Sequence, residues 1–183
     1  MRFETFLLWP VLAGLAACSP SQDWRDVALE VPGLKAQLPC KPDRTTREVP
    51  LGQRMVPLQV AGCESGSAML TLTTARLQAG DDVAAILQGW QQASAARLQT
   101  TPAGQPAQAW VPRGMLNVPG AQRVRWQGRD AKGQPVQFDG VWGAWLADGQ
   151  LHLVHAAVYQ PPAKRPTQAD ASLIDTFFES LRP

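Results

Sequence analysis

The sequence predicts an α+β domain in which two main helices pack on an antiparallel β-sheet. Two groups of segments with alternating apolar and polar residues are each followed by one segment with helical periodicity. Turn residues join the segments within each group, and such short turns connect only antiparallel neighbours. The 183 residues are enough for one domain, and 45% hydrophobic content is enough for a core.

The first group of strands lies in the amino-terminal half of the chain. Residues 27–31 and 34–38 alternate in the manner of short strands. Residues 55–61 and 70–74 alternate in the same way, with Leu70, Leu72 and Thr74 on one side, and the segment 64–67 between them has turn composition. These last two strands are predicted to form a hairpin.

A helix is expected after the first strand group. Asp81 and Asp82 suit a helix amino end, both as caps and by charge. Pro102 marks its far limit, and residues 100–120, rich in Pro, Gly and Gln, are predicted to be irregular. The apolar stripe of this helix comprises Val83, Ile86, Leu87, Trp90 and Leu98.

The second group is predicted to be a three-stranded meander followed by the last helix. Residues 136–146 form the longest alternating run, and Asp148-Gly149 is the favoured pair for a two-residue turn into 151–159. Thr167 and Asp170 resemble a capping box. The stripe expected to be buried comprises Leu173, Ile174, Phe177 and Leu181.

Residues 1–17 have the pattern of an export signal. Residues 6–17 carry no charge, and a run of twelve apolar or small residues is typical of a secretory signal. A helix needs about 20 apolar residues to cross a membrane, so this run is short for a span. An uncleaved anchor is the alternative, because the positive charge before the run is weak.

The end of this run resembles the lipobox of bacterial lipoproteins, in the residues Leu15-Ala16-Ala17-Cys18. The resemblance implies cleavage before Cys18, a diacylglyceryl group on its thiol and an acylated amino terminus. It further implies that residues 1–17 are a signal peptide, that residues 18–26 are a lipidated tether and that residues 27–183 form a single domain. Ser19 stands where aspartate would retain a lipoprotein in the inner membrane, so the outer membrane, facing the periplasm, is the expected location. Each buried methylene of an acyl chain stabilises membrane binding of such a protein by about 0.8 kcal/mol.

Two cysteines remain, Cys40 and Cys63. An exported chain meets an oxidising compartment, so we expect them to form a disulfide. The bridge would stabilise the fold by about 3 kcal/mol in the chain-entropy estimate. The alternative is a redox-active pair, which would normally have the Cys-x-x-Cys spacing that is absent here.

A second resemblance concerns the domain from about residue 31 to 181. The start Leu-Pro-Cys-Lys-Pro at 38–42, the meander ending at Tyr159 and the end Phe-Phe-Glu-Ser-Leu at 177–181 resemble a group of small exported bacterial domains. That group is similar in fold to the PsbP family, the extrinsic subunits of photosystem II, and to a eukaryotic Ran-binding import factor. The resemblance implies an α/β/α sandwich around an antiparallel sheet. It transfers no functional residue, because one fold serves many functions.

The sequence predicts no metal, cofactor or nucleic-acid site. His152 and His155 are the only histidines, and residues three apart on a strand face opposite sides. No glycine-rich nucleotide loop and no nucleophile elbow occurs. The net charge of +2, with scattered basic residues, excludes a typical nucleic-acid-binding face.

The candidate binding residues are Trp110, Arg113, Arg123 and Arg125. Convergent arginines hold carboxylates or phosphates through bidentate hydrogen bonds, and an aromatic residue on a loop suits a protein contact. The alternatives are a solvated arginine face and a loop that packs on the sheet. We expect a non-catalytic binding or accessory role, with the membrane and an envelope protein as partners. The alternative is a small-ligand receptor or hydrolase with a cleft near residues 100–125 that uses Arg113, Arg123 or His155.

Overall fold

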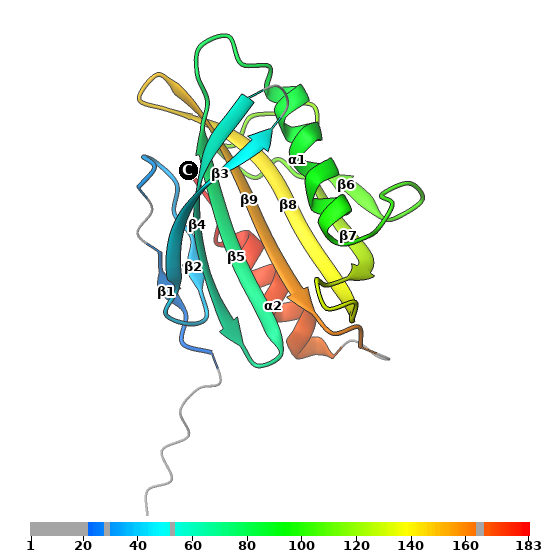
Figure 1. The fold of residues 1–183 in the computed structure, drawn as a ribbon. Coiled ribbons are helices and arrows are strands. Elements are labelled where there is room, and N and C mark those ends of the chain that lie inside the picture. The colour runs from blue at the N-terminus through cyan, green and yellow to red at the C-terminus, as the bar shows by residue number, and fades with distance from the viewer. Residues whose placement is uncertain (1–21, 28–29, 52–53, 164–166) are drawn as a thin grey trace, which may run out of the picture.

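A seven-stranded antiparallel sheet forms the centre of the protein (Figure 1). The computed structural model describes residues 22–27, 30–51, 54–163 and 167–183. The signal segment 1–17 and Cys18 lie outside the described residues. The strand order is β3-β4-β5-β9-β8-β7-β6. The strands are β3 (Asp43–Leu51), β4 (Arg54–Ser65), β5 (Ala68–Arg76), β6 (Ala107–Ala109), β7 (Gln122–Arg129), β8 (Pro135–Ala147) and β9 (Gln150–Gln160).

A second, two-stranded sheet precedes the large one. It pairs β1 (Arg25–Asp26) with β2 (Gln37–Leu38). The strand predicted over 34–38 is reduced to residues 37–38, and β1 lies before the strand predicted over 27–31. Residues 28–29 of that predicted strand lie outside the described residues, and residues 30–33 form a bend and turn.

One helix lies on each side of the large sheet (Figure 1). Helix α1 (Val83–Arg97) begins at Asp82, whose side chain accepts a hydrogen bond from the Ala85 amide. Helix α2 (Gln168–Glu179) begins with the predicted capping box of Thr167 and Asp170. None of the helices in the described part of the chain is long and apolar enough to cross a membrane.

The predicted α+β class, a sheet with two main helices packed on it in a PsbP-like α/β/α sandwich, is wrong for this chain. Strands hold 46% of the described residues and helices only 17%, so the protein is mostly β. The difference arises from the number of strands, since the described residues contain nine strands and only two helices, and β4 and β8 are nearly as long in residues as α1 and α2. Strand β3 was not predicted, because most of its side chains are exposed and it shows no apolar alternation.

Successive side chains of each strand point to opposite faces of the sheet, and this creates two separate hydrophobic cores. The core on the α1 side contains Trp126, Phe138 and Trp142, together with the buried side of α1. The core on the α2 side contains Trp145, the leucines of β5 and the buried side of α2. The β8–β9 turn at Asp148 and Gly149 has positive φ angles of 51° and 70°, as the predicted two-residue hairpin requires.

Candidate ligand-binding site

The site is a cavity of about 380 Å³ on the α2 side of the sheet. Residues 30–32, between β1 and β2, form its roof, and the strands β4, β5 and β9 form its floor and walls. A smaller cavity of about 180 Å³ shares Glu30, Thr46 and Gln59 with it. The larger volume lies within the range of small-molecule sites.

Two side chains of the large sheet hold the roof. Gln59 Nε2 on β4 donates a hydrogen bond of 3.0 Å to Glu30 Oε2. Trp145 Nε1 on β8 donates another of 3.0 Å to the carbonyl oxygen of Pro32. Trp145 is fully buried, so this second contact joins the roof to the core itself.

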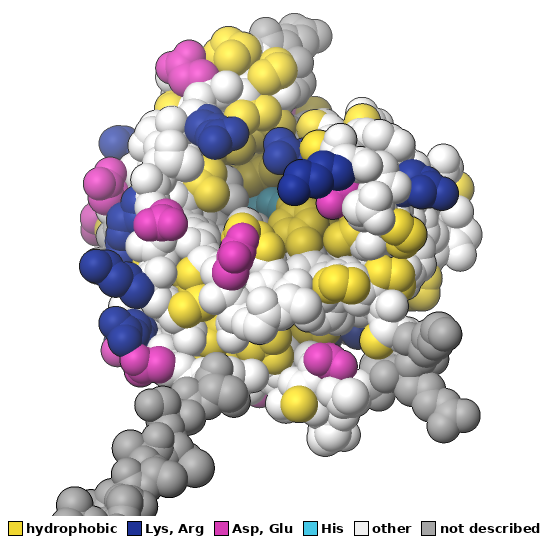
Figure 2. Space-filling model, turned by 60° about the horizontal axis from the view of Figure 1, so that its bottom comes forward, with side chains coloured by type: hydrophobic (Ala, Val, Ile, Leu, Met, Phe, Trp, Pro, Cys, Tyr) yellow, Lys and Arg dark blue, Asp and Glu magenta, His cyan; other side chains and the backbone are white. Residues whose placement is uncertain are grey.

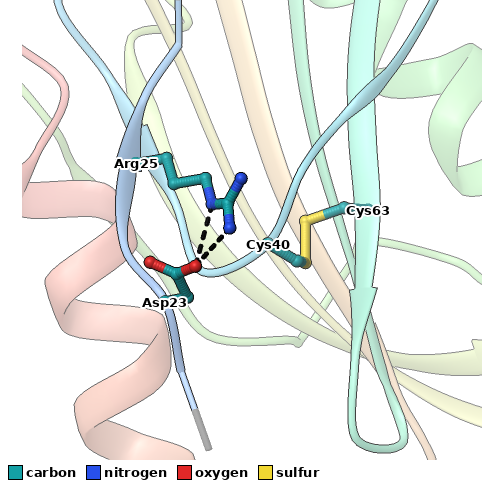
Figure 3. Close-up of a disulfide and its surroundings, with 4 residues drawn as sticks. All are labelled: Asp23, Arg25, Cys40 and Cys63. Atoms are coloured by element: carbon teal, nitrogen blue, oxygen red, sulfur yellow. Dashed lines mark hydrogen bonds and ion pairs between the residues drawn. A yellow bond between two sulfur atoms is a disulfide. The ribbon is translucent and has the colours of Figure 1, made fainter. Parts of the chain in front are cut away.

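The disulfide between Cys40 and Cys63 connects the same amino-terminal segment to β4, and the predicted pairing is confirmed (Figure 3). The two Cα atoms are 5.9 Å apart. Cys40 follows β2 and Cys63 is buried in the core on the α2 side. Near the bridge, Arg25 Nε donates to Asp23 Oδ2 at 3.1 Å. The segment that carries the roof is therefore covalently tied to the sheet.

Removal of the bridge is expected to lower the free energy of unfolding by about 3 kcal/mol, because the unfolded chain regains the entropy of an open loop. The double variant Cys40→Ala/Cys63→Ala should show this loss in urea denaturation. The wild type, denatured in a reducing agent, should show a loss of the same size. An unchanged midpoint in both experiments would refute a stabilising role for the bridge.

The deepest polar groups of the cavity belong to Thr74 on β5 and His152 on β9. Their exposed fractions are 0% and 2%. Thr74 Oγ1 and both ring nitrogens of His152 have no hydrogen-bond partner among the described residues. The His152 ring stacks on Trp145, the residue opposite it on β8, with ring centroids 5.0 Å apart. The stack leaves the imidazole on the cavity side of the sheet.

Burial lowers the pKa of His152 below its ordinary value, and the charge of Arg76 lowers it further. The Ala147 backbone and the charge of Asp148 raise this pKa by smaller amounts. Although Ala147 lies near the ring, it makes no hydrogen bond of normal geometry with it. Burial and Arg76 thus both favour the neutral imidazole, which has one nitrogen as a donor and one as an acceptor.

The charged groups of the cavity lie at its rim. Glu30, Arg76 and Asp148 line the cavity, and all three are exposed. Arg76 Nε donates a hydrogen bond to Gln150 Oε1 across the β5–β9 pair. Charge thus surrounds the entrance, while the floor contains only neutral polar atoms.

His155 faces the other side of the sheet, in the aromatic part of the α1 core. Its ring stacks on Trp142 with centroids 4.4 Å apart and meets the edge of Trp90 at 5.3 Å. Burial lowers the pKa of His155 to about 3.

Figure 2 shows a hollow in which hydrophobic side chains and a histidine are visible, with Lys and Arg side chains near its rim.

The predicted binding arginines on β7 are paired with carboxylates. Arg123 Nη2 lies 2.7 Å from Asp175 Oδ1 on α2, and its guanidinium lies 5.1 Å from the centre of the Phe178 ring. Arg125 Nε lies 2.7 Å from Oδ1 of the buried Asp139. Each arginine therefore has its own protein partner, and the two do not converge on one anion.

The other two predicted binding residues lie in the connection between β6 and β7. Trp110 is half-buried and packs against the core on the α2 side, where its ring leaves no space for a side chain at Gly143. Arg113 is exposed. Neither of the two cavities is lined by any residue of 100–125.

Sequence reasoning missed Thr74 and His152 as site residues. One signal was present, since Thr74 continues the alternation of Leu70 and Leu72 and so points a hydroxyl toward a buried face. No pattern in the sequence indicated that residues 30–32 form the roof, because these residues contact β4 and β8 only through residues distant in sequence.

In the described ranges no three His, Cys, Asp or Glu side chains gather as ligands for a metal ion. At the floor of the cavity, the Thr74 hydroxyl oxygen and the His152 ring nitrogens are buried and are not hydrogen-bonded to each other, so they do not form a paired nucleophile and base. No protein-family model matches the chain, and no curated protein sequence matches it either.

Proposed function

We propose that this protein is a lipid-anchored module of the bacterial cell envelope that binds a small molecule without transforming it. Cys18 is the site of lipidation, and the domain faces the periplasm from the outer membrane. The observation that carries the binding role is the cavity of about 380 Å³, which has apolar side chains in its walls and charged side chains exposed at its rim. Small-molecule sites are typically concave and mainly apolar, with a few polar groups that orient the ligand.

The envelope location is supported by the lipobox-like residues and by the disulfide. Bridges such as Cys40–Cys63 persist in oxidising compartments and are rare in the cytosol. A non-catalytic role is supported by the placement of the two histidines, because His152 and His155 lie in the cores on opposite sides of the sheet. They have different neighbours and do not form a shared reactive centre.

Labelling of bacteria that express the full chain with a fatty-acid analogue tests the anchor. We expect the wild type to take up the label and to fractionate with the outer membrane, whereas Cys18→Ser should lose both properties. The matched control is Cys40→Ser/Cys63→Ser, which removes two other cysteines and should keep the label.

The variant Ser19→Asp should keep the label and move to the inner membrane. Unchanged labelling of Cys18→Ser would overturn the proposed anchor. A wild-type protein that stays in the cytosolic fraction with reduced thiols would overturn the envelope location as well.

A further inference from the structure

Strand β3 forms the longer of the two edges of the large sheet (Figure 1). It contains nine residues, whereas β6 at the opposite edge contains three. Within the described residues no strand pairs with the outer side of β3, and its residues 43–48 are all exposed. Such an edge offers a row of unpaired backbone N–H and C=O groups to a further strand.

Pro50 indicates which backbone groups of β3 face outward. It lies opposite Met55 of β4, and it has no N–H to donate to that strand. Its nitrogen therefore faces the outer side. Because the direction of the backbone groups alternates along a strand, those of Arg44, Thr46 and Glu48 face outward as well. Each of these three residues presents one donor and one acceptor to a further strand.

A second, antiparallel copy of β3 complements this edge. When a two-fold axis passes beside Thr46, Arg44 of each copy lies opposite Glu48 of the other, and opposite charges across strands are stabilising. Each of the three outward residues then exchanges backbone hydrogen bonds with one of the three in the second copy. An axis at Thr45 would place Glu48 opposite Pro42, which has no N–H. The register about Thr46 is therefore the better match.

The same axis is compatible with the proposed lipid anchor. A two-fold axis between antiparallel strands is perpendicular to the sheet, so both copies keep their α2 sides on the same face. Trp24 and Val27 pack in the core on the α2 side, so the amino-terminal segments of both copies lie on that face. One membrane surface can then hold the lipid groups of both copies, and this confinement raises their effective concentration.

We propose that two copies of this chain pair through their β3 edges, in antiparallel register about Thr46, and so join their large sheets into one. The proposal adds an interaction surface to the small-molecule cavity, and neither depends on the other. Charge complementarity between Arg44 and Glu48 selects a second copy as the occupant of this edge.

Disulfide crosslinking of Thr46→Cys tests the pairing on the full-length protein, with many more detergent micelles than chains. Residues opposite each other at such a position have Cα atoms about 5.5 Å apart, which suits a disulfide. We expect this variant to form a disulfide-linked dimer under mild oxidation. The wild type, which has the same native cysteines, should not. Gln108→Cys, equally exposed on the β6 edge, is the matched control and should also stay monomeric.

Charge reversal in the Thr46→Cys protein tests the register. Arg44→Glu places two acids opposite each other at both ends of the pairing, and Glu48→Arg places two bases there. Each change should lower the yield of crosslinked dimer by about tenfold. The double variant Arg44→Glu/Glu48→Arg should restore it. A mixture of the two single variants should also give a mixed dimer, because each then meets the opposite charge.

The rescue separates pairing from a structural role, since a variant that failed to fold would not be restored by mixing. Absence of a dimer of Thr46→Cys would overturn the proposal, and so would equal crosslinking of Gln108→Cys, which would indicate random collision. Stronger crosslinking of Thr45→Cys, or a dimer yield unaffected by charge reversal, would overturn the register about Thr46. All of these results leave the cavity and the anchor standing.

Discussion

Acidification from pH 7.5 to 4.5 should lower the free energy of unfolding by about 3 kcal/mol through His155 alone. The pKa of this histidine is 6.5 in the unfolded chain and about 3 in the folded protein, because burial disfavours the charged ring. Below pH 6.5 the unfolded state binds a proton that the folded state does not. The stability is therefore complete above pH 6.5 and falls progressively between pH 6.5 and about pH 3.

The matched variant is His155→Phe, which keeps an aromatic ring against Trp142 and Trp90 and has no titrating group. Urea denaturation at the two pH values should show that the wild type loses about 3 kcal/mol more than the variant. All other ionisable groups are the same in both proteins, so the difference isolates His155. Equal losses in the two proteins would show that the His155 ring becomes protonated in the folded state without penalty.

Phe177→Ala should lower the free energy of unfolding by about 3–5 kcal/mol, the usual range for a phenylalanine removed from a core. Phe177 is fully buried in the core on the α2 side, and its ring lies 5.6 Å from that of Phe178. The loss has two causes, namely the missing free energy of burying the ring on folding and the cavity that the ring leaves behind. Urea denaturation measures the effect.

Asp175→Asn is the control on the same helix. It removes the charge that pairs with Arg123 while the packing of α2 stays intact. Because the Asp175 side chain is 51% exposed, we expect a loss of less than about 1 kcal/mol. A larger effect for Asp175→Asn than for Phe177→Ala would mean that charge rather than apolar burial holds α2 on the sheet.

Much of the local structure was predictable, since its causes lie within a few residues of one another. The cap at Asp82, the capping box at Thr167 and the Asp148-Gly149 hairpin are confirmed. The disulfide is also confirmed, because pairing follows from the number of cysteines and the expected compartment. The fold class was wrong since the edge strand β3 carries no apolar periodicity and pairs only because β4 lies beside it.

The site was less predictable than the fold. Arg123 and Arg125 were predicted to bind a ligand because they lie on one face of a strand. In the structure each of the two arginines pairs with its own carboxylate. Asp139 and Asp175 could not be identified as partners, because the pairing depends on the register of β8 and the position of α2. The unpaired atoms of Thr74 and His152 are visible only when the neighbours of each atom are known.

The sequence alone determined the turns and the helix caps, because each depends on short-range chemistry. The pairing of the cysteines followed from their number and the expected compartment, and the lipid on Cys18 stays a prediction from the resemblance to the lipobox. Only the tertiary structure decided that residues 30–32 cover β5 and β9 and enclose two neutral polar side chains. The physical reason is that an enclosed space is created by segments distant in sequence, whose contacts are selected by packing and leave no local pattern.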